Sequence, residues 1–156
     1  MDALTAYRVA IEPAWIDYNG HLRDAYYGVA FSLAIDDVMD QLGIDEAYRG
    51  RTRCTLYTLE THCHFLHEVK ASDELAVRTL VLDHDRKRLL AAGVFECSRV
   101  AGPVAVAEAL LLHVHQGEHP ASAPMPAGIE ARLAGLKLAA APTDLPRSRA
   151  LELRRR

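Results

Sequence analysis

One stretch of the chain repeats its apolar residues at the spacing of a helix, and it lies between positions 25 and 42. Apolar side chains recur there three or four residues apart, which places them along one face of roughly five helical turns. Asp24 precedes the stretch as a candidate N-cap, and Gly43 follows it where helices commonly end in the left-handed conformation. The pattern predicts one long helix whose buried face carries Tyr27, Ala30, Phe31, Ala34, Ile35, Val38 and Leu42.

Most of the remaining chain up to residue 116 alternates at the period of a β-strand. Strands are predicted at 5–11, 52–69, 75–82, 89–98 and 104–115, and one further helical turn at 45–50. The 52–69 strand has one polar face with Thr58, Glu60, His62 and His64, and an opposite face with Thr55, Tyr57, Leu59, Thr61, Cys63 and Phe65. The 104–115 strand is apolar on both faces, which is typical of a strand covered on both sides.

The order of these elements predicts the fold class. A short strand and the long helix come first, and four strands joined by short turns follow. Such a meander has an apolar face to bury, so we expect an α+β fold in which a curved antiparallel sheet wraps around one long helix. We expect one domain over residues 1–156, with a core at 5–116. The extension at 117–156 should hold a proline-rich linker, a helix at 127–139 and a frayed arginine tail.

Charge, cysteine content and hydropathy argue against several classes of protein. The net charge of -3 and pI near 6.2 provide no basic surface for nucleic acid, so we expect no nucleic-acid partner. Cys54, Cys63 and Cys97 are odd in number and form no C-x-x-C pair, which favours a reducing cytoplasm over a disulfide framework. No apolar run is long enough to span a bilayer and the N-terminus lacks a targeting pattern, so we expect no membrane association.

Candidate chemistry is concentrated just before the long helix, in the run P-A-W-I-D-Y-N-G-H-L-R-D-A-Y-Y at residues 13–27. Asn19 and Gly20 tolerate the left-handed region, so they predict a sharp bend that brings Asp17 and His21 together. The start of a helix carries unpaired N–H groups and partial positive charge, which suit a developing oxyanion. A carboxylate beside such a helix start is a catalytic arrangement.

These residues resemble a known enzyme family. The run W-I-D-Y-N-G-H-L ahead of a long helix, and the strand residues L-E-T-H at 59–62, are similar to the hotdog-fold acyl-CoA thioesterases of the 4-hydroxybenzoyl-CoA thioesterase type. Within that family the chain is most similar to the betainyl-CoA thioesterases associated with carnitine catabolism. The resemblance covers about residues 5–116. It implies hydrolysis of an acyl-CoA thioester to a free acid and coenzyme A, with no further cofactor and no metal.

The resemblance also implies roles for individual residues. Asp17 matches the family's nucleophile or general base, and the backbone of Asp24, Ala25 and Tyr26 matches the helix start that polarises the thioester carbonyl. Glu60 and Thr61 match strand positions that approach the site from a neighbouring subunit, so a homodimer or homotetramer is expected. Relatives carry an apolar residue after the turn glycine where this chain has His21, which leaves the role of that histidine open.

Several assignments keep a structural alternative. Asp17 can serve only to cap its own turn, and Asn19 and His21 can shape the loop or take part in catalysis. The histidines at 62, 64 and 67 lack an adjacent third ligand with convincing spacing, so no metal is predicted. His113 and His115 form a similar pair, and the fold could in principle bring the two pairs together. The arginine and lysine runs at 49–53 and 86–88 either hold coenzyme A phosphates or are solvated surface charge.

Aromatic residues suggest the acyl group. Four of the ten aromatic residues lie at 15–27. Tyr27 belongs to the buried helix face, whereas Trp15, Tyr18 and Tyr26 could enclose a trimethylammonium group through cation–π contacts. His62 is assigned with them to substrate binding. The competing interpretation is an aryl or medium-chain acyl group held by burial alone.

Two other functions use the same residues. A hotdog-fold dehydratase acting on hydroxyacyl thioesters would need a histidine and an acid, which His21 with Asp17 or Glu60 could supply. A non-catalytic protein that binds acyl thioesters would need the pocket alone. Release of free thiol separates hydrolysis from both alternatives.

Overall fold

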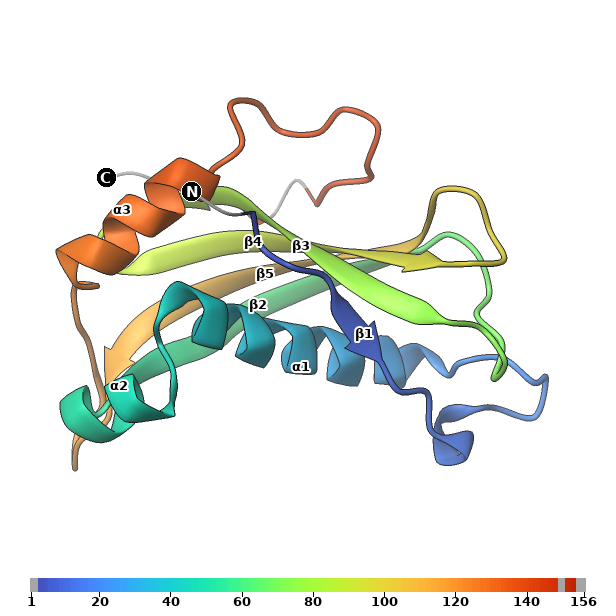
Figure 1. The fold of residues 1–156 in the computed structure, drawn as a ribbon, viewed down its shortest axis with the longest axis horizontal. Coiled ribbons are helices and arrows are strands. Elements are labelled where there is room, and N and C mark those ends of the chain that lie inside the picture. Colours follow the sequence, from blue (N-terminus) through green and yellow to red (C-terminus); the bar gives the residue numbers. More distant parts are fainter. Residues whose placement is uncertain (1–2, 149–150, 154–156) are drawn as a thin grey trace.

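A computed structural model describes residues 3–148 and 151–153 of the chain. The long helix lies against one face of a curved antiparallel sheet, and two shorter helices sit at one end of it (Figure 1). The elements are β1 (Tyr7–Val9), a 3-10 turn (Pro13–Trp15), α1 (Asp24–Leu42), α2 (Glu46–Thr52), β2 (Cys54–Phe65), β3 (Leu75–His84), β4 (Arg88–Cys97), β5 (Pro103–His115), β6 (Ala121–Ser122) and α3 (Ala127–Leu136). The predicted α+β class, with a sheet curved around one long helix, is confirmed.

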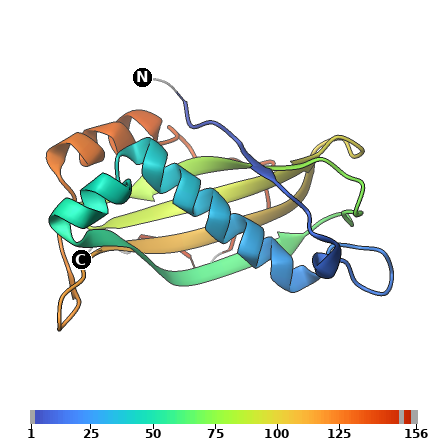
Figure 2. The same cartoon turned by 60° about the horizontal axis from the view of Figure 1, so that its bottom comes forward.

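The order of the strands differs from the predicted meander of four. The sheet runs β1-β3-β4-β5-β2, and β6 pairs with β5. Only β3, β4 and β5 form a meander, because the connection at 66–74 crosses from one side of the sheet to the other (Figure 2). As a result β2 lies at an edge beside β5, and β1 pairs with β3 at the opposite edge.

The helix prediction is confirmed along its buried face. All seven predicted apolar residues of α1 are buried, and Met39 joins them. Gly43 ends the helix with a φ of 87°, as predicted. The N-cap prediction is wrong, because Arg23 occupies the cap position with an extended backbone. Asp24 is instead the first helical residue, and its carboxylate accepts a hydrogen bond from the N–H of Ala25 at 2.9 Å.

A β-bulge in β2 overturns the predicted alternation of that strand. Thr58 pairs with Leu111 and Glu60 with Leu110, so Leu59 is the extra residue. The insertion brings Thr58 onto the helix-facing side that also carries Thr61. From Glu60 onward the side chains lie on the faces that the alternation predicts. Up to Thr58 each side chain lies on the face opposite to the predicted one.

The ends of several elements shift by a few residues. The first strand is reduced to three residues, and α2 extends two residues beyond its predicted end. Asp45 caps α2 by accepting a hydrogen bond from the N–H of Tyr48 at 2.8 Å. The predicted linker contains the short strand β6, and α3 ends three residues early. In the part of the chain that the structure describes, no helix is both long and apolar enough to cross a membrane.

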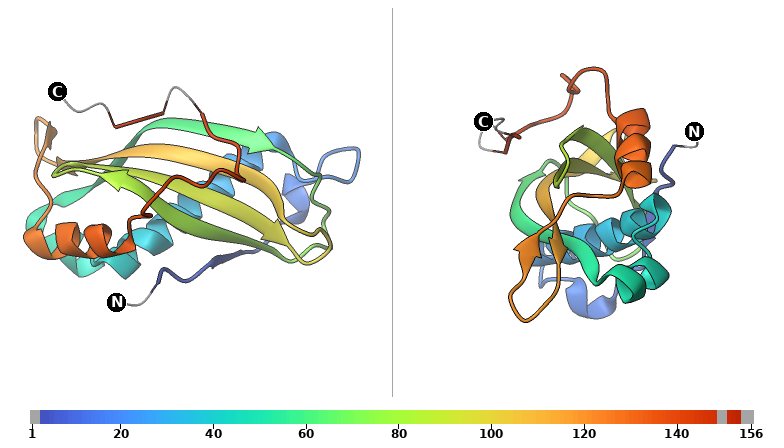
Figure 3. Two further views of the ribbon diagram at one scale, coloured as in Figure 1. Left: turned by 90° about the horizontal axis from the view of Figure 1, so that it is seen from above. Right: turned by 90° about the vertical axis from the view of Figure 1, so that its left-hand side faces the viewer.

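The segment that follows α3, which we call the strap (residues 137–148 and 151–153), crosses the sheet face opposite α1 (Figure 3). The N–H of Leu138 donates to the carbonyl of Val81 at 3.1 Å. Leu151 is buried in a small apolar cluster that includes Leu82 and Leu90. The extension therefore packs against the sheet, although its expected arginine tail at 154–156 lies outside the described residues.

The strap also provides an ion pair inside the protein. Glu108 points out of the middle of β5 and has no exposed surface. Its carboxylate accepts hydrogen bonds from the side chain of Arg147 and from the N–H of Ser148. A buried carboxylate needs such partners because it has lost its hydration. The pair fixes the strap over the centre of the sheet.

Candidate active site

Asp17 sits in a tight turn that its own carboxylate helps to form. Its Oδ1 accepts hydrogen bonds from the N–H groups of Asn19 at 2.8 Å and His21 at 3.1 Å. The backbone N–H of Asp17 donates to the carbonyl of His21 at 2.8 Å, and Gly20 has a φ of 77°. The predicted bend at residues 19 and 20 and the proximity of Asp17 to His21 are therefore present.

The same turn keeps the Asp17 carboxylate ionised. The N–H of His21 lowers the pKa of Asp17 below its ordinary value of 3.8, against a smaller opposing effect of burial. The N–H of Asn19 and the charges of His21 and Arg23 lower it further. Among the described residues no hydrogen bond reaches Oδ2, so one carboxylate oxygen remains available to a substrate or a water.

A pocket of about 500 Å³ opens beside this carboxylate. One wall is the turn and the first residues of α1, from Asp17 to Tyr27, and the other is the segment that leaves β2, residues 65–68. The N–H of Leu22 donates to the carbonyl of Val69 at 2.7 Å and joins the two walls. The pocket therefore has a fixed backbone frame on both sides of Asp17.

The helix start offers fewer free donors than the sequence suggests. The N–H of Ala25 is bound by the Asp24 carboxylate, and that of Tyr26 donates to the carbonyl of Arg23 at 3.0 Å. The N–H of Asp24 has no partner among the described residues. Of the three predicted oxyanion donors, it is the one that is free in this structure.

The aromatic residues do not form the expected three-ring enclosure. The rings of Trp15 and Tyr26 stack on each other with centroids 5.2 Å apart and planes 11° apart, and Trp15 is buried. A cation cannot enter between rings in direct contact. Tyr18 is 92% exposed at the mouth of the pocket. The pocket's other aromatic residues are Tyr27 and Phe65, whose rings meet edge to face at 5.1 Å.

Tyr27 is a pocket residue as well as a helix residue. Burial raises its pKa to about 12, with smaller contributions from nearby acidic groups. Its hydroxyl therefore stays protonated at neutral pH and can donate a hydrogen bond. The helical spacing predicts only the buried position of Tyr27, because spacing does not show that the tip of the side chain reaches the end of the core.

The candidate residues on β2 lie in a different pocket from Asp17. Thr61 and His62 line a cavity of about 300 Å³ between α1 and β2, and Glu60 is exposed. Thr61 is four residues from Phe65, which corresponds to about 13 Å along an extended strand. Because β2 is an edge strand, the side chain of Glu60 is open to solvent. One chain does not bring these residues to Asp17.

Comparison with known proteins decides the family. Residues 11–133 match the thioesterase-like superfamily. The chain is 43% identical over 133 residues to the betainyl-CoA thioesterase of Pseudomonas aeruginosa strain PAO1, a match covering 85% of this chain and 83% of that protein. The chain belongs to the thioesterase-like superfamily.

Longer relatives carry a similar sequence within a fused protein. The L-carnitine dehydrogenase/betainyl-CoA thioesterase of Rhizobium meliloti strain 1021 is 31% identical over 136 residues, which is 87% of this chain but only 27% of that protein. The chain thus corresponds to about a quarter of this two-function relative. The resemblance to betainyl-CoA thioesterases noted from the motif residues is confirmed.

Solved structures of other proteins share the fold. A candidate thioesterase from Pseudomonas putida KT2440 superposes with a TM-score of 0.76 at 38% identity, covering 97% of this chain and 99% of that one. A Staphylococcus aureus protein solved in complex with CoA gives a TM-score of 0.80 at 23% identity, over 90% and 88% of the two chains. The hotdog architecture predicted from the sequence is confirmed.

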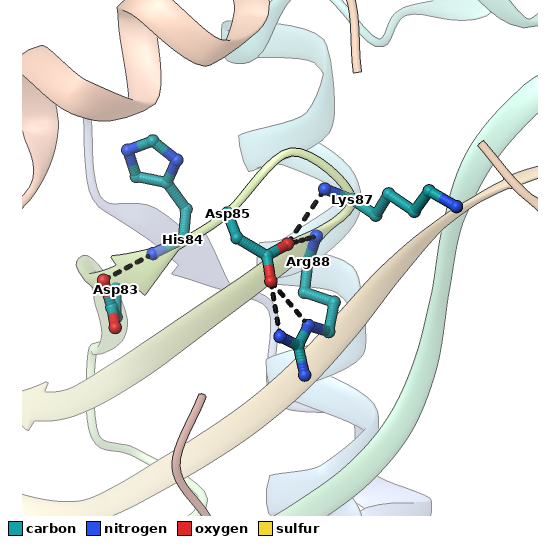
Figure 4. A network of polar contacts seen from close by, with 5 residues as sticks. All are labelled: Asp83, His84, Asp85, Lys87 and Arg88. Carbon is teal, nitrogen blue, oxygen red and sulfur yellow. Dashed lines mark hydrogen bonds and ion pairs between the residues drawn. The ribbon is translucent and has the colours of Figure 1, made fainter. Parts of the chain in front are cut away.

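In this thioesterase-like chain the two basic runs at 49–53 and 86–88 lie far from Asp17. The Asp85 carboxylate accepts hydrogen bonds from the N–H groups of Lys87 and Arg88 and from the Arg88 side chain (Figure 4). Lys87 Nζ donates to Ser122 at 3.2 Å. The hairpin and α2 lie at the opposite end of the molecule from the Asp17 turn (Figure 1). Whether these residues bind coenzyme A phosphates stays a prediction.

His62, Cys63 and His64 lie on β2, outside the Asp17 pocket. His62 and His64 lie side by side with ring centroids 4.7 Å apart. No group of three or more potential metal ligands occurs in residues 3–148 and 151–153. Burial raises the pKa of Cys63 to about 11, so its thiol is a poor nucleophile at neutral pH.

Sequence reasoning missed the second wall of the pocket. Phe65, Leu66, His67 and Glu68 line it beside Asp17. The first two are exposed apolar residues closely followed by an acid, at a strand end where burial is not needed for folding. That combination is the signal that could have identified them.

Proposed function

We propose that this protein hydrolyses betainyl-CoA to glycine betaine and coenzyme A. Acyl-CoA thioester hydrolysis is the activity of its thioesterase relatives, and the 43% identity to a betainyl-CoA thioesterase supports the acyl group. The observation that carries the proposal is Asp17, ionised at neutral pH, with Oδ2 open to a pocket at the start of α1.

Asp17 has two possible roles in the reaction. Its carboxylate can attack the thioester carbonyl and break the C–S bond, so that the CoA thiolate leaves and water hydrolyses the resulting anhydride. Alternatively, it can take a proton from a water that attacks the carbonyl and displaces the same thiolate. Both routes need the ionised form that the turn stabilises. The free N–H of Asp24 then faces the negative charge that builds on the carbonyl oxygen, and a single donor of this kind contributes roughly 3–4 kcal/mol in comparable sites.

His21 and Asn19 support the same group. Both donate backbone hydrogen bonds to the Asp17 carboxylate. We assign them to positioning, and we assign Trp15 and Tyr26 to the stacked base that holds the turn against α1. In this arrangement Tyr18 remains the one predicted aromatic residue that can contact the substrate from the pocket mouth.

We further propose that the active unit is a homodimer joined through β2. Among the residues described, the large exposed apolar side chains outside the Asp17 pocket all lie on α1 or β2: Val29, Leu33, Tyr57 and Leu59. A long edge strand with exposed apolar groups is a surface for pairing with another chain. A second copy would supply the Glu60, Thr61 and His62 that one chain keeps away from Asp17.

We also propose a cytoplasmic location, in keeping with the free thiols of Cys54, Cys63 and Cys97.

Thiol release from a panel of acyl-CoA substrates tests the proposed function. The panel contains betainyl-CoA, its uncharged isostere 3,3-dimethylbutanoyl-CoA, an aryl-CoA and a medium-chain acyl-CoA. We expect betainyl-CoA to have the highest kcat/KM, with glycine betaine as the product. A higher kcat/KM for an uncharged substrate would contradict the acyl group while leaving the thioesterase activity. Absence of thiol release from the whole panel would contradict the activity itself.

A further inference from the structure

The charges that line the Asp17 pocket are mostly negative. Three carboxylates line it, those of Asp17, Asp24 and Glu68, against the single guanidinium of Arg23. Two of the carboxylates have structural duties, since Asp17 closes its turn and Asp24 binds the N–H of Ala25. No ion pair joins Glu68 to a cation in the described part of the chain. Of these three carboxylates, Glu68 is the one that neither closes the turn nor binds the helix start, so it can meet a ligand while Asp17 serves the reaction.

The backbone around Glu68 is fixed by four hydrogen bonds. The N–H groups of Leu66 and His67 both donate to the carbonyl of Val104, at 2.9 and 3.0 Å. Arg99 Nη2 donates to the carbonyl of Glu68 at 2.9 Å. The carbonyl of the next residue, Val69, accepts the bond from Leu22 described above. The chain therefore holds Glu68 in place relative to Asp17 before any ligand binds, which reduces the entropy cost of binding.

Glu68 carries its charge at neutral pH. Its own backbone N–H holds the pKa of its carboxyl below the ordinary value, against a smaller effect of burial, and the charges of His21, Arg99 and Lys70 lower it further. Next to it lie Phe65, which is 54% exposed, and Leu66, which is 41% exposed. This wall of the pocket thus combines exposed apolar surface with one negative charge.

A trimethylammonium group has the complementary chemistry. Its charge cannot donate an N–H hydrogen bond, and its methyl groups favour aromatic and apolar contacts with a carboxylate nearby. In a trimethylammonioacetyl thioester the nitrogen is two bonds from the carbonyl carbon, about 2.5 Å away by standard bond lengths. A carbonyl within about 3.5 Å of Asp17 therefore places the cation inside the same pocket.

We propose that Glu68 is a specificity-determining residue, which recognises a quaternary ammonium group next to the thioester carbonyl, with Phe65 contacting its methyl groups. This inference rests on the proposed function and adds the residue that selects the charge of the acyl group. A carboxylate and a cation about 6 Å apart at a partly hydrated surface attract each other enough to change affinity by about tenfold.

The test compares two substrates of the same shape in three variants. Betainyl-CoA and 3,3-dimethylbutanoyl-CoA differ in the charged nitrogen alone, so the ratio of their kcat/KM values reports recognition of the charge. In Glu68→Gln we expect kcat/KM for betainyl-CoA to fall about tenfold and that for the uncharged isostere to stay within about twofold. Glu68→Asp should retain most of the ratio. Glu74→Gln, an exposed acid outside the pocket, is the matched control and should leave both values unchanged.

Each outcome decides a separate point. If the wild type does not prefer betainyl-CoA, the proposed acyl group is wrong and the inference falls with it. If the wild type prefers betainyl-CoA and Glu68→Gln keeps the full preference, the inference alone is overturned. If Glu68→Gln lowers both substrates equally, Glu68 has a structural role and the inference is overturned. Rising salt should reduce the wild-type ratio, because the Glu68 carboxylate is exposed.

Discussion

Gly93 of β4 lies directly beneath the ring of Phe31 in α1, so closely that a Cβ on residue 93 would stand 2.5 Å from the ring atom Cε2. The same Cβ would lie 3.0 Å from Val77 on the neighbouring strand. The absence of a side chain at Gly93 therefore sets how near α1 can approach the sheet. That distance also fixes where the start of α1 stands relative to the pocket.

Gly93→Ala should therefore destabilise the protein. We expect the free energy of unfolding to fall by about 1–3 kcal/mol, the usual cost of overfilling a packed core. Gly50→Ala in α2 is the control, since nothing lies within 4 Å of the position that its new methyl group would take, and alanine favours a helix. We expect that variant to be unchanged or more stable by about 0.5–1 kcal/mol. Urea unfolding measures both, and equal stability of the two variants would contradict the close contact.

Asp17→Asn should remove most of the activity without unfolding the protein. Asparagine keeps an oxygen for the N–H groups of Asn19 and His21 but can neither attack a thioester nor accept a proton. We expect kcat to fall at least about a hundredfold. Glu12→Gln, a nearby exposed acid outside the pocket, should keep full activity. Circular dichroism checks the fold, and retained turnover would remove Asp17 from the mechanism.

Mixing two inactive variants tests the shared site. If Asp17 acts together with Thr61 of a second copy, then Asp17→Asn and Thr61→Val each disable both sites of a homodimer. Random exchange of subunits makes half of the dimers mixed, and each mixed dimer has one intact site. The mixture should recover about a quarter of wild-type activity. No recovery after demonstrated exchange would place both residues in one chain's site, and a folded, active monomer in light scattering would contradict the dimer.

The pH dependence follows from the lowered pKa of Asp17. A carboxyl whose folded pKa lies below its ordinary value of 3.8 is ionised at any pH well above that value, and it loses its charge only as the pH falls through the lower folded value. The activity that depends on Asp17 should therefore be constant from about pH 5 upward. Measurement of kcat/KM from about pH 4 to about pH 9 checks this, provided that the enzyme stays folded. A fall in kcat/KM between about pH 7 and about pH 5 in the folded enzyme would contradict this expectation.

The ion pair under the strap should contribute to stability. Arg147→Met would leave the buried Glu108 without its cation, and breaking one side of such a pair costs about 3 kcal/mol. Arg78→Met breaks the exposed pair between Arg78 and Glu96 and should cost about 1 kcal/mol or less. Thermal unfolding of the two variants compares them directly. Equal shifts would mean that the strap does not depend on Arg147.

The sequence predicted those elements of the fold that depend only on residues close together in the chain. The apolar stripe of α1 and the bend at Gly20 each depend on a few neighbouring residues, and both are present. The position of β2 beside β5 depends on pairing between distant segments, which spacing along the chain does not contain. The bulge at Leu59 also leaves no mark in an alternating pattern.

In the candidate site, too, the sequence predicted the features formed by neighbouring residues and missed those formed by distant ones. Asp17 and its turn are encoded within five residues, so the sequence located them. The stacking of Trp15 on Tyr26 depends on the angle at which the chain enters α1, and proximity in sequence does not give ring orientation. Glu68 lies in the 66–74 connection, which crosses the sheet from β2 to β3. The order of the strands in the sequence predicts that β2 and β3 are neighbours, so it does not predict that this connection lines the pocket.

The strap has a consequence for how large an assembly this protein can build. Besides its edges at β1 and β2, the sheet has a convex face opposite α1 on which a second copy could pack. Here the convex face is already occupied by the chain's own residues, anchored at Glu108 and sealed by Leu151. In the proposed homodimer the second copy would pair along the β2 edge, and an edge that pairs by two-fold symmetry accepts one copy. The strap would then keep further copies from packing on the face opposite α1.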